Sequence, residues 1–167
     1  GRIRSGTTDG DQQRVRGVMK RATRKRATDR NEHQRMRVVL VVEDDKPIGD
    51  VVVDAINDEA GYTAVRVGNA TDAMEALGSA PADLIVLDIH LPGMSGVELF
   101  DRLRSDDRYR HVPVIFETGT MHEHVQALRD RGVAMYVRKP FDLSDLVSYV
   151  KRLAPPFPPL RAATPRS

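Results

Sequence analysis

The sequence contains no cysteine and no long run of apolar residues. Without cysteine the chain has neither a disulfide framework nor thiolate chemistry, which agrees with a reducing compartment. No apolar run approaches the ~20 residues that a membrane-spanning helix needs. No apolar segment follows the basic N-terminal residues, as it would in a signal peptide. We therefore expect a cytoplasmic protein with no membrane partner.

Basic and acidic residues are unevenly distributed along the 167-residue chain, although its net charge is only +2. Residues 1–36 contain 11 Lys and Arg against 4 Asp and Glu, whereas residues 37–153 contain 13 against 20. Residues 154–167 add two Arg and are rich in proline, which favours an extended tail. We predict a basic, flexible N-terminal arm over 1–36, one globular domain over 37–153 and a Pro-rich tail over 154–167.

The basic arm has two interpretations. Its polar composition favours a solvated tail. A short helix is also compatible with the apolar spacing, which involves Val15, Val18, Met19 and Ala22. The alternative is an arm that binds nucleic acid or an acidic partner, centred on residues 20–26. No aromatic residue precedes Tyr62, so stacking on bases is not supported and we do not expect nucleic acid as a partner.

Beyond the arm, apolar β-branched runs alternate with amphipathic segments. We predict strands at Val38–Val42, Tyr62–Val67, Leu84–Asp88, Pro113–Phe116 and Val133–Val137. Helices are expected over residues 46–60, 69–77, 95–103, 121–132 and 142–153, with a capping box at Ser95 and Glu98 and an N-cap at Asp142. The alternation predicts an α/β fold with a five-stranded parallel, doubly wound sheet, the flavodoxin-like (βα)5 arrangement.

Polar residues gather where the predicted strands end. The carboxyl ends of parallel strands meet at one edge of a sheet, where ligands bind. The polar residues expected at this edge are Glu43, Asp44, Asp88, Thr118 and Lys139. Each one alone has a structural explanation, such as a turn-forming Asp or an acidic pair before a helix. Their joint occurrence at four strand ends favours a functional site.

The chemistry of this set is that of phosphoryl transfer. Carboxylates at close range raise each other's pKa, and a hard divalent cation such as Mg²⁺ relieves the repulsion. One carboxylate can then attack a phosphoryl group and form an acyl phosphate. The cation, the Lys139 ammonium and the Thr118 hydroxyl would stabilise the developing negative charge.

Four motifs extend this pattern: Val41-Val42-Glu43-Asp44-Asp45, Leu87-Asp88-Ile89-His90-Leu91-Pro92-Gly93-Met94-Ser95-Gly96, Thr118-Gly119 and Lys139-Pro140-Phe141. With these motifs, residues 37–153 resemble the receiver domain of a two-component response regulator. The separations agree as well, with 44 residues from Asp44 to Asp88, 30 from Asp88 to Thr118 and 21 from Thr118 to Lys139.

The resemblance implies that Asp88 accepts a phosphoryl group from a phosphohistidine of a histidine kinase or phosphotransfer protein. Asp44, Asp88 and the backbone carbonyl of His90 would bind Mg²⁺ directly. Glu43 would act mainly through a metal-bound water. Lys139 would pair with the phosphoryl oxygens, and its bond to the following proline is expected to be cis.

The resemblance also implies a switch. Thr118 would hydrogen-bond the phosphoryl group and move toward it, and Tyr136 would turn inward as it does so. The fourth helix, fifth strand and fifth helix would then form the face that binds a downstream protein. The chain would not be an enzyme with a separate substrate, because its chemistry is its own phosphorylation and dephosphorylation. It would be a monomer or a phosphorylation-dependent dimer.

Two features depart from the family pattern. Glu117 precedes Thr118 where similar domains have an apolar residue, so it is either half-buried or a source of extra negative charge. His90, two residues after Asp88, lies at the rim of the site, and we hypothesise that it tunes the acyl phosphate lifetime. The alternative is an ordinary exposed loop histidine. His122 and His124 are expected to face solvent.

Two other functions compete with this interpretation. A phosphatase of the haloacid dehalogenase type also uses a strand-end Asp and Mg²⁺, but it needs a second Asp two residues later, where this chain has His90. The other is a DNA-binding response regulator that is truncated or that uses the basic arm. We see no helix-turn-helix pattern for it.

Overall fold

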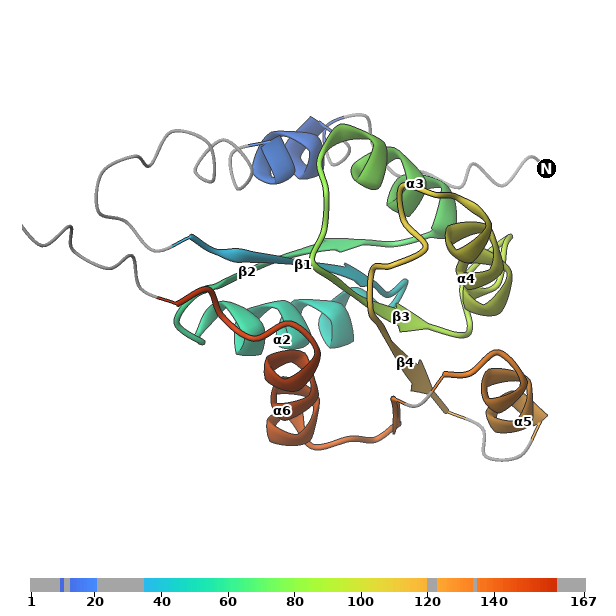
Figure 1. The fold of residues 1–167 in the computed structure, drawn as a ribbon. Helices are drawn as coiled ribbons and strands as arrows, with labels where there is room; N and C mark the ends of the chain where they lie inside the picture. The colour runs from blue at the N-terminus through green and yellow to red at the C-terminus, as the bar shows by residue number, and fades with distance from the viewer. Residues whose placement is uncertain (1–9, 11–12, 21–34, 120–122, 134, 159–167) are drawn as a thin grey trace, which may run out of the picture.

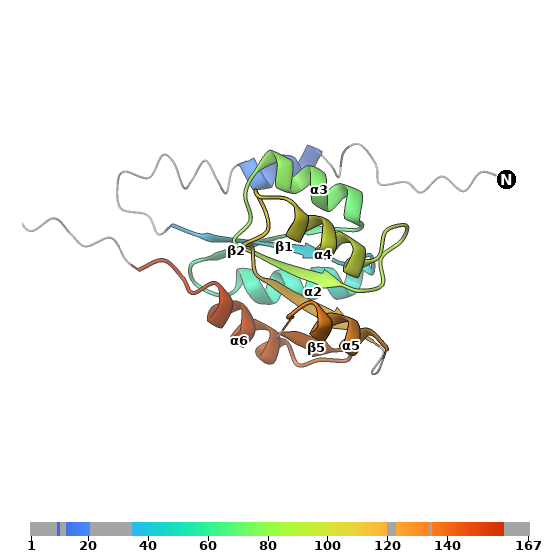
Figure 2. The ribbon, with the colours of Figure 1, turned by 45° about the vertical axis from the view of Figure 1, so that its right-hand side comes forward.

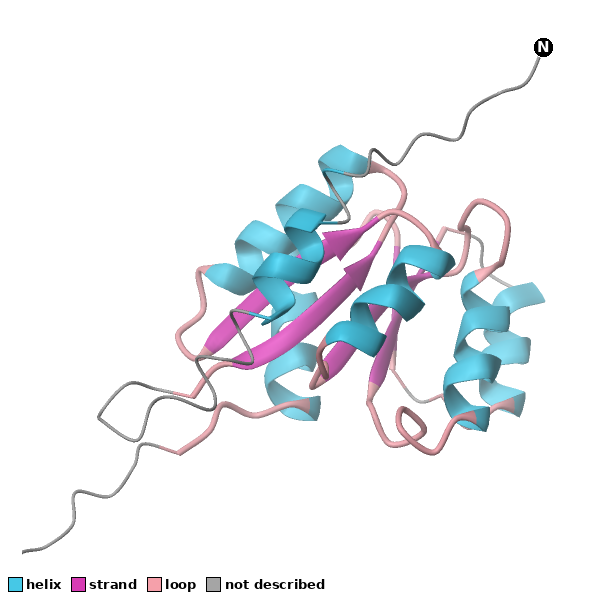
Figure 3. Ribbon diagram, turned by 90° about the horizontal axis from the view of Figure 1, so that it is seen from above, coloured by secondary structure: helices cyan, strands magenta, loops and turns pink. Residues whose placement is uncertain are grey.

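A computed structural model of the chain describes residues 10, 13–20, 35–119, 123–133 and 135–158. Five parallel strands form one sheet in the order β2-β1-β3-β4-β5, and they run in the same direction in Figure 3. The strands are β1 (Arg37–Val42), β2 (Tyr62–Val67), β3 (Leu84–Asp88), β4 (Val114–Thr118) and β5 (Tyr136–Arg138). The predicted flavodoxin-like fold is therefore confirmed.

Helices cover both faces of the sheet. They are α2 (Lys46–Asn57), α3 (Ala70–Ser79), α4 (Gly96–Ser105), α5 (Glu123–Asp130) and α6 (Leu143–Leu153). In Figures 1 and 2, α2 and α6 lie on one side of the sheet, and α3 and α4 lie on the other. Among the described residues, no helix combines the length and the apolar character needed to cross a bilayer.

The alternation of side chains along β1 explains the two layers. Val39 and Val41 are fully buried in the cluster that includes α2 and α6. Val38, Leu40 and Val42 are fully buried in the cluster that includes α3 and α4. Successive side chains of a strand point to opposite faces, so this continuous apolar run supplies both cores. Burying each such side chain contributes about 1.5–3 kcal/mol.

Two predicted helix starts are confirmed in detail. The Ser95 hydroxyl accepts from the Glu98 N–H at 3.2 Å, and the Glu98 carboxylate accepts from the Ser95 N–H at 2.8 Å, which is a complete capping box. The Asp142 carboxylate accepts from the Ser144 N–H at 2.8 Å and begins α6. These caps satisfy backbone donors that a helix leaves unpaired.

The fifth strand begins later than predicted. Val133 was expected to open it, but its N–H donates to the carbonyl of Leu128 at 3.0 Å and so closes the end of α5. Gly132 supports this turn with a φ of 72°, the left-handed conformation common after helix ends. The first residue of the apolar run therefore belongs to the turn that ends α5, and β5 is only three residues long.

Part of the basic arm packs against the domain. Residues 13–20 are helical, as the apolar spacing allowed, and Met19 is fully buried in the core cluster beside α3. Arg16 pairs with Glu75 of α3 at 2.6 Å. A solvated, flexible tail is therefore the wrong description of these eight residues. Ala22 and residues 20–26 beyond Lys20 lie outside the described part of the chain.

The start of the C-terminal segment also contacts the domain. The Tyr62 hydroxyl donates to the carbonyl of Ala154 at 2.8 Å, and Arg37 Nε donates to the carbonyl of Pro155 at 2.7 Å. The Arg37 guanidinium lies 3.6 Å from the centre of the Phe157 ring, a cation–π contact. Residues 154–158 lack regular structure, as the prolines predict, and they contact the domain beside the first residue of β1.

Gly96 is needed because α4 begins against the end of β3. Its N–H donates to the carbonyl of Ile89 at 2.9 Å. A Cβ at this position would lie 2.1 Å from the carbonyl oxygen of Asp88. Because that neighbour is backbone, any side chain at Gly96 would displace the turn that carries Asp88.

We expect Gly96→Ala to lower the free energy of unfolding by about 1–3 kcal/mol, the usual cost of overpacking. Gly78→Ala is the matched control, because a Cβ there meets nothing within 4 Å and alanine is the better helix former. Urea unfolding followed by circular dichroism measures both. Equal stability of the two variants would contradict this account of Gly96.

Candidate functional site

Three carboxylates meet at the carboxyl edge of the sheet. Glu43 and Asp44 follow β1, Asp88 ends β3, and one oxygen of each lies within 4.8 Å of the others. Glu43 and Asp88 are buried, whereas Asp44 is exposed. The structure thus brings together the acids that the strand ends predicted. Three like charges at this range need a compensating cation.

Lys139, which follows β5, supplies part of that compensation. Its Nζ lies 2.6 Å from Glu43 Oε2 and 3.2 Å from Asp88 Oδ2. Burial lowers the pKa of the Lys139 ammonium, but its hydrogen bond to Glu43 and the nearby carboxylates outweigh burial, so the pKa is raised overall. Lys139 is therefore held in its charged form beside Asp88.

Backbone donors complete the environment of the two buried acids. The N–H of His90 donates to Asp88 Oδ1 at 3.0 Å. The N–H of Asp45 donates to Glu43 Oε1 at 3.0 Å. The carboxylates of Glu43 and Asp88 therefore each have one oxygen on a backbone N–H and the other on Lys139. This arrangement fixes the orientation of both side chains.

The two residues expected to form the switch lie on neighbouring strands, and Thr118 contacts the backbone of Lys139. Thr118 is buried at the end of β4, and its carbonyl accepts from the N–H of Lys139 at 2.8 Å. The Lys139–Pro140 bond is cis, as the resemblance implied. Tyr136 is half-buried, pairs with Phe116 across the sheet and packs on the α3–α4 side. The movements assigned to Thr118 and Tyr136 stay predictions.

Glu117 is fully buried, more so than the half-buried position considered from the sequence. It pairs with Asp88 in the parallel register, and neither of its carboxyl oxygens has a hydrogen-bond partner among the described residues. Burial raises the pKa of Glu117 to about 8, and the neighbouring Glu43 adds to the shift.

His90, two residues after Asp88, contacts a second histidine. Its side chain is exposed, and its ring lies 5.0 Å from the ring of His124 on α5, centroid to centroid, in an edge-to-face arrangement of 79°. His124 is half-buried, so the expectation that it faces solvent is wrong. His122 lies outside the described residues. The contact joins the loop after β3 to the helix after β4.

Two residues near the acids were missed from the sequence. Arg66 of β2 donates from Nη1 to the carbonyl of Glu43 at 2.8 Å. Gly49 of α2 lies against the stem of this arginine. No spacing rule connects a position on β2 to the end of β1. The one available signal was a glycine inside a predicted helix, where alanine would be more stable by about 1 kcal/mol.

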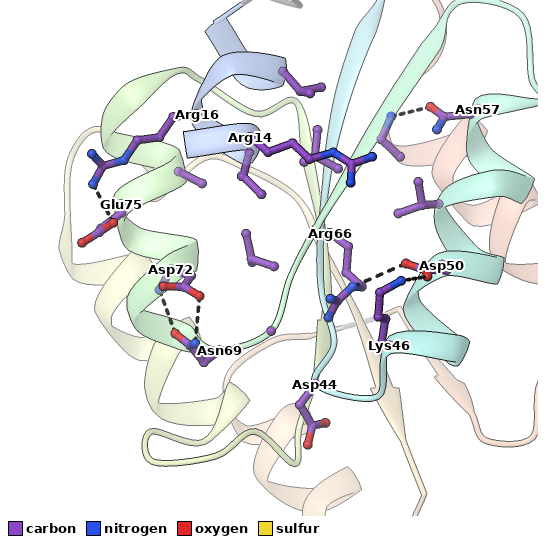
Figure 4. A pocket seen from close by; sticks show the side chains of 18 of the residues that line it. Arg14, Arg16, Asp44, Lys46, Asp50, Asn57, Arg66, Asn69, Asp72 and Glu75 are labelled. Atoms are coloured by element: carbon purple, nitrogen blue, oxygen red, sulfur yellow. Dashed lines mark hydrogen bonds and ion pairs between the residues drawn. The ribbon is translucent and has the colours of Figure 1, made fainter. Parts of the chain in front are cut away.

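A groove of about 780 Å³ runs beside the site along β2, the first strand in the sheet order, and Figure 4 shows it from close by. Residues of α2, α3 and the 13–20 helix form its walls. Asp44 lies both in this groove and in the acid cluster. The groove carries charges of both signs, including Arg14, Arg66 and Asp54, so it does not by its charge define a ligand.

The donor set fits a hard divalent cation. Asp44 and Asp88 offer carboxylate oxygens, which are the ligands that Mg²⁺ prefers. Both oxygens of Glu43 are already bonded, to Lys139 and to the Asp45 N–H, which suits a contact through water better than direct ligation. The sequence-based assignment of these ligands stays a prediction.

Fold and site together define a flavodoxin-like protein with an acid cluster and a lysine at its strand ends. A family model described as "Response regulator receiver domain" matches residues 39–151. The chain belongs to this family. It is a receiver domain of the two-component response regulator type.

Curated relatives span several kinds of signalling protein. "Polar-differentiation response regulator DivK" of Brucella anthropi is 32% identical over 114 residues, which cover 68% of this chain and 92% of that protein. "Phosphate regulon transcriptional regulatory protein PhoB" of Pseudomonas aeruginosa is 34% identical over 117 residues, which cover 69% of this chain and 50% of that protein. The chain thus spans about half the length of PhoB but nearly all of DivK.

Solved structures of receiver domains share the fold. Chemotaxis protein CheY4 of Vibrio cholerae has a TM-score of 0.65 and 28% identity, and the match covers 71% of this chain and 98% of CheY4. The signal receiver domain of a signal transduction histidine kinase from Syntrophus aciditrophicus has the same TM-score and identity, with 71% and 89% covered.

Glu117 predicts a pH dependence of stability in the metal-free protein. The folded state keeps the Glu117 proton up to about pH 8, whereas a solvated Glu releases it near pH 4.5. The folded state therefore binds more protons over this range, and stability falls as the pH rises, by about 1.4 kcal/mol per pH unit. Glu117→Gln removes this loss and should be the more stable protein at pH 7.5.

Urea unfolding with EDTA at pH 5.5 and pH 7.5 measures the difference. The surface variant Glu75→Gln is the control. Its free energy of unfolding should fall with pH as steeply as that of the wild type. If the free energy of unfolding falls equally with pH in the wild type and in Glu117→Gln, the buried carboxyl is not the source of the pH dependence.

Proposed function

We propose that the chain is a phosphoacceptor receiver whose Asp88 takes a phosphoryl group from a phosphohistidine of a histidine kinase or phosphotransfer protein. The observation that carries this proposal is the environment of Asp88. Its buried carboxylate ends β3, lies 3.2 Å from the Lys139 ammonium and shares its site with two further acids. This is the arrangement that phosphoryl transfer to a carboxylate needs.

In the proposed reaction a carboxylate oxygen of Asp88 attacks the phosphorus atom. The P–N bond of the phosphohistidine breaks, and its electron pair stays on the imidazole nitrogen. Lys139, already held beside Asp88 Oδ2, stabilises the negative charge on the transferring oxygens. The Thr118 hydroxyl would donate to the same group.

Asp44, Asp88 and the carbonyl of His90 would hold Mg²⁺, with Glu43 acting through water. When bound, Mg²⁺ supplies positive charge that the transferring phosphoryl group and the three carboxylates require. Lys139 alone leaves the cluster with more negative than positive groups. The metal and the lysine therefore have complementary roles.

The output of the domain would be a change of binding surface. A phosphoryl group on Asp88 adds negative charge beside Thr118, which biases a two-state element toward its second state. In this structure the proposed output face consists of α5, β5 and α6, and Tyr136 belongs to its strand. The downstream partner would be a protein, and the chain would turn over no separate substrate. Relatives named as a histidine kinase and as transcriptional regulators support such partners.

Incubation with a small acyl phosphate and Mg²⁺, followed by intact mass measurement, tests the main proposal. We expect a gain of one phosphoryl group that EDTA prevents. Asp88→Asn should abolish the gain, whereas Asp54→Asn, which alters an exposed aspartate of α2, should retain it. A gain that persists in Asp88→Asn would refute the assignment.

We predict that the contact between His90 and His124 lengthens the lifetime of the acyl phosphate, because paired rings on the loop that leaves Asp88 would limit the access of water to it. His90→Ala and His124→Ala should both lose the phosphoryl group faster than the wild type. His124→Phe keeps an aromatic edge and should retain the wild-type rate. Dephosphorylation is followed by intact mass after removal of the donor, and an unchanged rate in His90→Ala would remove this role.

A further inference from the structure

Arg66 links the edge strand of the sheet to the acid cluster. It belongs to β2, and its Nη1 donates to the carbonyl oxygen of Glu43 at 2.8 Å, just beyond the end of β1. Its Nε lies 3.6 Å from Asp50 on α2, a contact that Figure 4 shows beside the groove. The side chain is only 18% exposed. The guanidinium is therefore held in place by its contacts and is largely shielded from solvent.

Gly49 provides the space for this arginine. A Cβ at position 49 would lie 2.3 Å from Cδ of Arg66 and 3.3 Å from Cγ of Glu43. Its backbone is helical, so the glycine is not needed for an unusual φ angle. The lack of a side chain is what lets Arg66 cross the first turn of α2 and reach Glu43.

The bonded carbonyl belongs to the peptide that leads from Glu43 to Asp44. On its other side, the N–H of Glu43 donates to the carbonyl of Val67 at 3.0 Å. Arg66 and Val67 therefore hold both backbone groups of Glu43. The Asp44 carboxylate has no hydrogen bond or ion pair among the described residues, so its direction depends on this backbone. Rotation of the Glu43–Asp44 peptide would carry Asp44 away from Asp88.

The charge of Arg66 is only partly balanced, because its carboxylate partner is shared with a lysine. Asp50 contacts Arg66 and also pairs with Lys46 one turn earlier on α2. A cation at the acid cluster would therefore approach a guanidinium whose charge is shared with a carboxylate. Arg66 can orient the acid pair through its hydrogen bond without supplying the charge that the acids need.

We propose that Arg66 is a positioning residue for metal binding, which fixes the Glu43–Asp44 peptide so that Asp44 faces Asp88, and that Gly49 is its required companion. The proposal rests on the proposed function, since the cation is part of it. Groups that orient metal ligands typically change metal affinity by 10–100-fold when removed. The expected readout is therefore metal affinity in the absence of any phosphoryl donor.

The experiment measures Mn²⁺ binding by electron paramagnetic resonance, with Mg²⁺ as competitor, on the full chain. Arg66→Met keeps the stem that packs on Gly49 and removes the guanidinium, so it should fold and bind Mn²⁺ roughly tenfold more weakly. Arg16→Ala is the matched control, because Arg16 also lines the groove but pairs with Glu75 away from the acids. It should bind as the wild type does.

A double variant separates positioning from a general structural effect. Gly49→Ala alone displaces Arg66 and should weaken Mn²⁺ binding about as much as Arg66→Ala does, on the order of tenfold. Gly49→Ala combined with Arg66→Ala should cause little further loss of affinity, because the 2.3 Å clash with Arg66 is gone and only the 3.3 Å approach to Cγ of Glu43 is left. Additive losses of affinity, or wild-type affinity in Arg66→Met, would overturn the proposal.

Wild-type controls distinguish this failure from failure of the proposed function. If the wild type binds Mn²⁺ and gains a phosphoryl group at Asp88 while Arg66→Met binds equally well, only the role of Arg66 is refuted. If the wild type neither binds the metal nor gains mass, the proposed function fails, and the role of Arg66 fails with it.

Discussion

The concentration of negative charge at one end of the sheet is the constraint on which this structure depends. Glu43, Asp44 and Asp88 lie within 4.8 Å of one another, and two of them are buried. Such a cluster is tolerated only with dense compensation. Lys139 and backbone N–H groups provide it in part, and a hard cation fits the remainder. The resting domain is thus incomplete in charge, which makes it responsive to whatever binds there.

Strand ends made the central site predictable. Unbroken apolar runs identify buried parallel strands, and the residue after each run must lie at the ligand-binding edge. This rule places Asp44, Asp88 and Lys139 at that edge from the sequence alone. It failed for Val133, whose apolar character serves a helix end, because periodicity over a few residues does not distinguish a strand from a capping turn.

Contacts between distant polar groups were not predictable. Arg66 reaches Glu43 only because β2 is the neighbour of β1 and Gly49 leaves room, and neither fact follows from local pattern. The docking of Met19 is similar, since its spacing indicated a helix but not a surface to receive it. Glu117 was recognised as unusual, yet its complete burial depends on how β4 sits between β3 and β5.

Arg37 holds Pro155 and Phe157 against the domain, which determines where a group attached after these residues would lie. Arg37 opens β1 and Glu43 follows its end, so this anchor and the acids are separated by the length of the strand, about 20 Å at ~3.3 Å per residue. A fluorophore or fusion partner attached after residue 158 would start from the opposite pole of the sheet. The acid cluster would then stay accessible to a kinase, whatever group is attached at the other end of the sheet.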